Sequence, residues 1–266
     1  MQLHFQKMQG AGNKITIVDQ RVAKAVVPDE AVLQALRDAS PDDPFDQLMW
    51  LNLPRNPASA TAYRVFNFDG SEVEQCGNGA RCVAVLLASQ DDMPRDFTMD
   101  SPAGPVQARV GDGQSASIDM GPPAFDDSHS SLAVNGVDLA VSLVSMGNPH
   151  CILDVDDVQT ADVETLGPAI ESHELFPART NVGFMQIVDR KNIKLRVFER
   201  GVGETRACGS GACAAMVAGV KLDFLENQAT AILSGGELSL EWQGEANPVM
   251  MTGETAMVYQ GEIEYE

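Results

Sequence analysis

The feature that most constrains how this chain can fold is an internal repeat, in which one half matches the other at a constant offset of 132 residues. The positions that superpose without a gap are Val65 on Val197, Phe66 on Phe198, Glu72 on Glu204, Cys76 on Cys208, Gly77 on Gly209, Gly79 on Gly211, Ala80 on Ala212, Gly104 on Gly236 and Gly121 on Gly253. Chance matching of two Gly- and Ala-rich stretches does not explain a register kept over about 57 positions. We infer two related domains that arose by duplication and fusion.

Strand-like and helix-like stretches recur in the same order in both halves, although the offset drifts upstream of the repeat. Apolar, strand-like runs lie at 15–18, 47–53 and 62–68 in the first half and at 151–155, 182–188 and 193–198 in the second. Helices are expected at 28–39, where Pro28 suits the first turn, and at 162–175. The pattern predicts an α+β fold in which each half is mostly strand.

The repeat also predicts where the domains divide. We expect an N-terminal domain over residues 1–113 and a C-terminal domain over 114–254, related by pseudo-symmetry. A final strand at 256–263 has no counterpart at the end of the first half. Residues 255–266 are therefore expected to cross back and complete the N-terminal domain.

Composition excludes several classes of partner. The chain has 266 residues, with 18 Lys and Arg against 38 Asp and Glu, so its formal net charge is −20. A chain this acidic is repelled by phosphate backbones and anionic lipid, which argues against nucleic-acid or membrane binding. The first residues do not form a signal peptide and no apolar run is long enough to span a membrane, so we expect a cytoplasmic protein.

Two cysteines stand at the start of two apolar helices. Cys76 precedes Gly77-Asn78-Gly79-Ala80 and Cys208 precedes Gly209-Ser210-Gly211-Ala212, and each segment runs into a stretch almost without charge. Such helices should be buried in their domains. Their first N–H groups carry partial positive charge that can bind an anion, and the same field lowers the pKa of a thiol placed there toward neutrality.

Other interpretations of the cysteines account for less of the pattern. Cys82, Cys151 and Cys213 lie within apolar stretches and have no partner at the repeat offset, so we expect them to fill the core. The spacing does not match a structural zinc site, and no Gly-Lys-Ser/Thr follows the glycines as a P-loop requires. We expect no metal and no cofactor. A Cys-His hydrolase stays open, but it would leave the second cysteine unexplained.

Duplicated domains commonly face each other across a pseudo-twofold axis, with the active site in the cleft between them. Two thiols on opposite faces of one carbon could then invert a stereocentre. One thiolate would remove the proton and the opposite thiol would return one to the other face, with helix amides stabilising the carboxylate of the carbanion. This chemistry predicts a small amino-acid substrate.

At these motifs the sequence closely resembles the diaminopimelate epimerase family, whose members act without pyridoxal phosphate. The segments that carry the resemblance are 66–82, 146–150 and 199–213, supported by 10–13, 180–182 and 251–253. The resemblance covers the whole chain. It implies two similar domains, each a mixed or antiparallel sheet wrapped around a central buried helix.

The resemblance also implies roles for individual residues. Cys76 and Cys208 would be the catalytic base and acid, with His150 assisting. The residues that would bind the substrate are Asn13, Gln47, Asn67, Gly77, Asn78, Asn148, Asn181, Glu199, Arg200, Gly209 and Ser210. Within this set, Arg200 would pair with the distal carboxylate and the amides after each cysteine would cradle carboxylates.

Two segments depart from the family pattern. Lys14-Ile15 replaces an acidic residue followed by an aromatic one, and residues 40–45 replace a Gly-rich stretch. Three functions follow: epimerisation of LL-diaminopimelate to the meso form for lysine and cell-wall synthesis, racemisation of another amino acid, or amino-acid binding without catalysis. The expected partner is the substrate, with a homodimer as one option for assembly.

Overall fold

The computed structural model describes residues 2–21, 27–128 and 130–265, and in these residues it contains nineteen strands and four α-helices. The chain divides into two compact units. Unit 1 comprises the residues up to Ile118 together with those from Gly253 onward, and unit 2 runs from Asp119 to Thr252. No helix among the described residues is long and apolar enough to cross a membrane.

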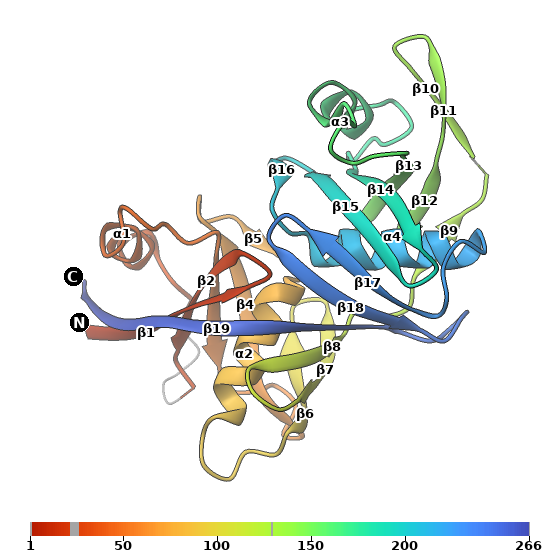
Figure 1. The fold of residues 1–266 in the computed structure, drawn as a ribbon. Helices are drawn as coiled ribbons and strands as arrows, with labels where there is room; N and C mark the ends of the chain where they lie inside the picture. Colours follow the sequence, from red (N-terminus) through yellow and green to blue (C-terminus); the bar gives the residue numbers. More distant parts are fainter. Residues whose placement is uncertain (1, 22–26, 129, 266) are drawn as a thin grey trace. The chain divides into compact units, whose positions relative to one another are not determined.

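Unit 1 is a ring of strands closed around one helix (Figure 1). Its neighbouring strands follow the order β19-β1-β2-β3-β4-β6-β7-β8, and β8 pairs back with β19. The pairs β2–β3 and β4–β6 are parallel, while the other pairs with a resolved register are antiparallel. Its elements are β1 (Gln2–Gly10), β2 (Asn13–Asp19), α1 (Glu30–Asp38), β3 (Gln47–Asn52), β4 (Ser59–Asn67), β5 (Glu72–Val73), α2 (Gly77–Ala88), β6 (Asp96–Ser101), β7 (Gly104–Val110) and β8 (Ser115–Asp119).

Unit 2 repeats this order of pairing around α4. Strands β12, β13, β14, β15, β17 and β18 follow one another, with β13–β14 and β15–β17 parallel. The first residues of β19 pair with β18, and β9 pairs with β12. Its elements are β9 (Ala124–Asp126), β10 (Ser131–Val134), β11 (Val137–Ala140), β12 (Ser142–Ser145), β13 (Pro149–Asp154), α3 (Val163–Glu171), β14 (Asn181–Asp189), β15 (Asn192–Glu199), β16 (Gly203–Thr205), α4 (Gly209–Lys221), β17 (Gln228–Leu233), β18 (Gly236–Trp242) and β19 (Val249–Glu264).

The central helices are buried because, apart from Asn78 and Arg81 near the start of α2, their buried residues are apolar or glycine. In α2 the buried residues include Ala80, Cys82, Val83, Ala84 and Leu87, and α4 is buried continuously from Gly211 to Gly219. Strand β3 and the first half of β14 are buried on both faces and are correspondingly apolar. Strands β7 and β18 instead alternate buried and exposed residues, so they present one face to solvent. These observations confirm the expected α+β class, with mostly sheet and a buried helix in each half.

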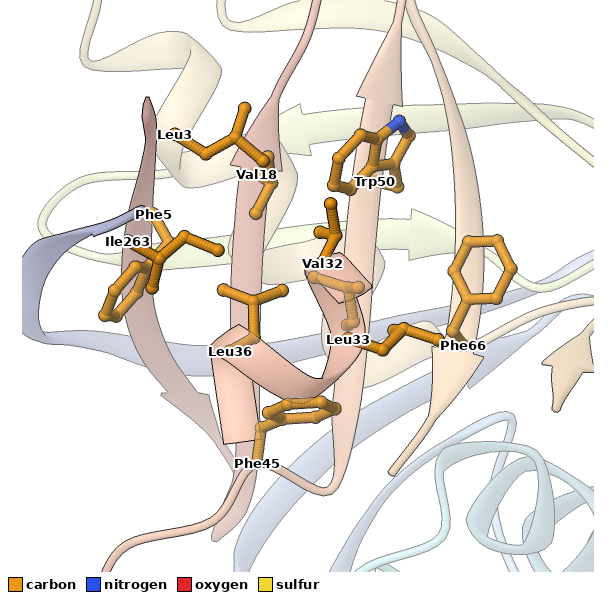
Figure 2. Close-up of a cluster of buried hydrophobic side chains, with 11 residues drawn as sticks. Leu3, Phe5, Val18, Val32, Leu33, Leu36, Phe45, Trp50, Phe66 and Ile263 are labelled. Carbon is orange, nitrogen blue, oxygen red and sulfur yellow. The ribbon is translucent and has the colours of Figure 1, made fainter. Parts of the chain in front are cut away.

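A second layer covers the outer face of the ring in unit 1 (Figure 2). Leu33 and Leu36 of α1 pack into a cluster with Leu48 and Trp50 of β3 and Phe66 of β4. Because side chains alternate along a strand, the residues between these face inward toward α2. Helix α3 packs in the same way on a separate cluster of unit 2.

The repeat register is kept in detail. Strands β6 and β7 match β17 and β18 residue for residue at the offset of 132. The two halves also share an ion pair that accompanies this register. Arg64 donates to Glu72 at 2.6 and 2.5 Å, and Arg196 donates to Glu204 at 2.7 and 2.9 Å. Each ion pair links a long strand to the short strand that precedes a cysteine: β4 to β5 before Cys76, and β15 to β16 before Cys208.

Three expectations need correction. Pro28 lies outside α1, because Asp29 is the N-cap and its carboxylate accepts the Val32 N–H. Helix α3 ends at Glu171, several residues before the expected end, with Ser172 as its C-cap. The final strand begins earlier than expected, because β19 starts at Val249 and its first residues pair with β18 as β8 pairs with β7.

The repeated ion pair makes a stability prediction with an internal comparison. Arg196 also donates to the carbonyls of Val158 and Ala161, at 2.9 and 3.3 Å, whereas Arg64 donates to Glu72 and lies 5.2 Å from the centre of the Phe66 ring. We expect Arg64→Met to lower the free energy of unfolding by up to about 1 kcal/mol and Arg196→Met by about 1–3 kcal/mol. Urea unfolding of both variants measures the difference; equal losses would contradict it.

Candidate active site

Each predicted catalytic cysteine is the N-cap of a central helix. Cys76 precedes α2 and its sulfur accepts the Gly79 N–H at 3.2 Å, while Cys208 occupies the same position before α4. Both side chains are buried. The first-turn amides of each helix have no partner within the helix, so they are donors available to a carboxylate. These amides belong to Gly77 and Asn78 in unit 1 and to Gly209 and Ser210 in unit 2.

In unit 1 the structure brings the predicted polar residues together beside Cys76. The thiol donates to Gln47 Oε1 at 2.5 Å, and Asn13 Oδ1 lies 3.9 Å from the sulfur. Gln47 Nε2 donates to Asn67 Oδ1 at 3.4 Å. Asn78, next in α2, is buried and accepts from the guanidinium of Arg81.

Strand pairing explains why residues so far apart in sequence meet here. Gln47 starts β3 and pairs with Ile15 in the parallel strand β2, two residues after Asn13. In the antiparallel strand β4, Asn67 is the register partner of Gln47. The three amides therefore stand at one edge of the ring, where α2 begins.

The equivalent edge of unit 2 carries the rest of the predicted set. His150 is the register partner of Asn181, as Ile15 is of Gln47, and Asn148 stands two residues earlier as Asn13 does. Glu199 takes the place of Asn67 at the repeat offset. Asn148 donates to Ser210 Oγ at 3.3 Å. The two edges thus match in position, but unit 2 carries a carboxylate and an imidazole where unit 1 has an amide and an isoleucine.

The carboxylate at this edge affects the pKa of the thiol in unit 2, Cys208. Burial raises the pKa of Cys208 well above its usual value, and the negative charge of Glu199 raises it further. The Thr205 hydroxyl donates to Glu199 Oε1 at 2.5 Å and holds the carboxylate in place. The expectation that the helix lowers the pKa of Cys208 toward neutrality is therefore wrong: burial and a neighbouring anion outweigh the helix N-terminus.

His150 is a buried neutral imidazole. Burial lowers its pKa to about 3, and the nearby positive charge of Arg200 acts in the same direction. Nε2 lies 3.0 Å from Asn148 Oδ1, whereas the buried Nδ1 has no hydrogen-bond partner. In this state His150 orients Asn148 and cannot serve as a cation.

Asn181 and Arg200 are linked through the backbone. Asn181 donates to the Pro149 carbonyl at 2.9 Å and accepts the Arg200 N–H at 3.0 Å, so its amide ties β13 to the end of β15. The Arg200 side chain is exposed, and one of its NH groups lies 3.4 Å from the Ala178 carbonyl. The Arg200 side chain can therefore reach an anion, while the side chain of Asn181 chiefly joins two backbone segments by hydrogen bonds.

Comparison with known proteins identifies the family of this chain. The family model for diaminopimelate epimerase matches residues 5–125 and 142–258. A diaminopimelate epimerase from Pseudomonas syringae pv. tomato is 44% identical over 276 aligned residues, covering 99% of each chain. This chain belongs to the diaminopimelate epimerase family. Its membership places it among isomerases of the epimerase and racemase type.

Solved structures of more distant proteins share the fold of this family member. A hydroxyproline epimerase from Agrobacterium vitis superposes with a TM-score of 0.74 at 16% identity, covering 98% of this chain and 91% of that one. A phenazine biosynthesis protein of the PhzF family from Bacillus anthracis gives 0.71 at 14% identity, covering 99% of each chain. At these identities the likeness concerns the fold.

The family motifs did not single out three residues that support the site. Thr205 holds Glu199, Asp46 accepts from Asn13 at 3.2 Å, and Glu171 accepts the Gly201 N–H at 2.7 Å beside Arg200. Of the three, only Thr205 could have been found from the sequence, because it directly follows Glu204, which matches Glu72 in the repeat. The other two depend on contacts between segments about 30 residues apart.

The buried imidazole makes the acid stability of this family member predictable. In the unfolded chain a histidine binds a proton below about pH 6.5, whereas His150 in the folded protein stays neutral down to about pH 3. The unfolded state therefore gains protons as the pH falls through this window, and the free energy of unfolding falls by up to about 1.4 kcal/mol per pH unit. We expect a shallower decline for His150→Gln, measured by urea unfolding from pH 7 to pH 4.

The control for that experiment is His4→Gln, because the side chain of His4 is 76% exposed. The free energy of unfolding of His4→Gln should fall with decreasing pH as steeply as that of the wild type. Parallel curves for His150→Gln and wild type would show that the imidazole titrates normally in the folded protein.

The carboxylate beside Cys208 predicts a reactivity change. Since Glu199 raises the pKa of Cys208, Glu199→Gln should increase the thiolate fraction and accelerate alkylation of Cys208 by iodoacetamide at pH 8 several-fold. Peptide mass spectrometry follows each cysteine separately. Glu204→Gln, which removes a carboxylate paired with Arg196, is the matched control. An unchanged rate at Cys208 in Glu199→Gln would refute the electrostatic role of Glu199.

Proposed function

We propose that this protein is a diaminopimelate epimerase that interconverts LL-2,6-diaminopimelate and meso-diaminopimelate with two cysteines and no cofactor. The observation that carries the proposal is the repeat of one catalytic arrangement. In each half a buried cysteine caps the central helix beside side chains that match in position, within a chain 44% identical to a diaminopimelate epimerase over its length.

The proposed chemistry uses one thiolate and one thiol. With Cys76 as thiolate, its sulfur removes the α-proton from one face of the carbon, and the Cys208 thiol gives its proton to the other face. Inversion leaves Cys76 protonated and Cys208 as thiolate, which is the state needed for the reverse reaction. The resting protonation of Cys208 beside Glu199 suits this assignment.

The carbanion between the two proton transfers must be stabilised. Negative charge spreads from the α-carbon onto the substrate carboxylate, and the amides of Gly77, Asn78, Gly209 and Ser210 are suited to receive it. The proposal also assigns Arg200 to the distal carboxylate, where a guanidinium can bind two oxygens at once.

The amides complete the proposed substrate contacts. Asn13, Gln47, Asn67 and Asn148 would bind the amino and carboxylate groups, with His150 setting the orientation of Asn148. Glu199 would keep the second thiol protonated, and Asn181 would hold the Arg200 turn. We further propose that units 1 and 2 are the two epimerase domains, and that the protein works in the reducing cytoplasm, where its thiols stay reduced.

Solvent exchange tests this function. Reduced protein is incubated with LL-diaminopimelate in D₂O, and α-deuterium uptake is followed together with the ratio of LL to meso isomers. We expect uptake with conversion in the wild type, and a loss of roughly a thousandfold in kcat in Cys76→Ser and Cys208→Ser because each removes one proton-transfer group. Cys82→Ala, on the same helix as Cys76 but away from its start, is the matched control.

The outcomes separate the alternatives. Failure of the wild type on diaminopimelate with activity on another amino acid would make the protein a racemase of different specificity. Binding without exchange across an amino-acid panel would make it a non-catalytic binding protein. Full activity in either serine variant would overturn the two-cysteine mechanism.

A further inference from the structure

A cluster of opposite charges fixes the segment that leads from α1 into β3. The carboxylate of Asp43 lies between two lysines, with Lys14 Nζ 2.7 Å from one oxygen and Lys7 Nζ 3.3 Å from the other. Lys7 also donates to the backbone carbonyl of Asp43. The cluster thus joins three segments of unit 1: β1, the start of β2 and the α1–β3 segment.

Lys7 makes this attachment hard to release. Its side chain is only 2% exposed, and an ammonium group removed from water needs an anionic or polar partner. Its Nζ also lies 5.9 Å from the centre of the Tyr259 ring, and the Tyr259 hydroxyl bonds to Ser40 at the beginning of the same segment. The α1–β3 segment is therefore bound to the strands of unit 1 at two points, Ser40 and Asp43.

The segment ends at the catalytic edge. Asp46 donates its N–H to the Lys14 carbonyl at 2.8 Å, and its carboxylate accepts the Lys14 N–H at 2.7 Å and Asn13 Nδ2 at 3.2 Å. The next residue is Gln47, whose side chain accepts from the Cys76 thiol at 2.5 Å. Lys14 consequently holds the segment twice, by its side chain at Asp43 and by its backbone at Asp46.

The fold itself does not require this cluster. Unit 2 forms the same parallel pair, β13–β14, with Pro149 at the position that matches Lys14. Lys14 and the acidic segment 40–45 also belong to the two segments that the sequence analysis set apart from the resemblance. Because Lys14 and Asp43 contact each other, these two departures are one coupled change beside the catalytic edge.

We propose that the Lys7–Asp43–Lys14 cluster is a positioning device that keeps Asn13 and Gln47 in place against the Cys76 thiol. Lys14 and Asp43 are positioning residues here, since they act on the thiol through Asp46, Asn13 and Gln47. The consequence for kcat rests on the proposed function, whereas the consequence for the thiol itself does not.

The first test needs no substrate. Lys14→Met removes one of the two cations on Asp43 and keeps the backbone bonds between residues 14 and 46, so we expect it to loosen the contact between Gln47 and the thiol. Because an acceptor oxygen on the thiol favours its protonated form, the pH profile of Cys76 alkylation by iodoacetamide should shift to lower pH and the rate at pH 7.5 should rise several-fold. The profile of Cys208 should stay unchanged. Lys14→Arg should restore the wild-type profile, and Asp43→Asn should behave like Lys14→Met.

The second test measures turnover of LL-diaminopimelate. We expect Lys14→Met to lower kcat about tenfold and to raise KM as well, since Asn13 and Gln47 lie near the thiol and are also among the proposed substrate contacts. The matched control is Lys221→Met, which removes a Lys–Asp pair with Asp127 in unit 2. It should leave both kcat and the Cys76 profile at wild-type values.

The outcomes are decisive in each direction. A Cys76 profile unchanged in folded Lys14→Met and Asp43→Asn would overturn the proposal, as would a shift in Lys14→Arg equal to that in Lys14→Met. A shifted profile in a protein that turns over no diaminopimelate would support the positioning role and reject the proposed substrate. Circular dichroism and the melting temperature establish that each variant is folded.

Discussion

Each unit is organised around the first turn of one buried helix. Helices α2 and α4 are apolar nearly all round, and the closed layer of strands buries them. A helix end enclosed in this way still presents amide groups without partners, and Cys76 and Cys208 stand beside them as N-caps. Burial of the helix therefore creates both the anion site and the reactive position, and the strands that enclose it supply the surrounding side chains.

The two units use this shared design differently. Unit 1 places neutral amides around its cysteine, whereas unit 2 places the carboxylate of Glu199 and the neutral imidazole of His150 near the matching edge. At the repeat offset Glu199 replaces Asn67, and its negative charge adds to burial in raising the pKa of Cys208. Duplication thus provided two copies of a scaffold whose electrostatics could diverge.

Sequence patterns were sufficient for the parts of the structure that depend on local periodicity and on the repeat. The offset that aligned Cys76 with Cys208 also aligns β6 with β17 and β7 with β18. The ion pairs of Arg64 and Arg196 lay in that register as well and could have been read from it. Patterns failed where contacts join distant segments: Asp43 reaches Lys14 only because β2 and β3 pair in parallel, and β8 was missed because it is short and half polar.

The long strand β19 imposes an order on how the chain can fold during synthesis. Its first residues belong to unit 2, but from Thr255 onward it pairs with β1, and it also borders β8. Unit 2 is built from one continuous stretch, whereas unit 1 needs a strand translated after all of unit 2. Until that strand arrives, the edges of β1 and β8 are open on the nascent chain, and open strand edges invite pairing with other chains. The first unit to be translated is thus the last that can close, and its strand edges stay open for longest during synthesis.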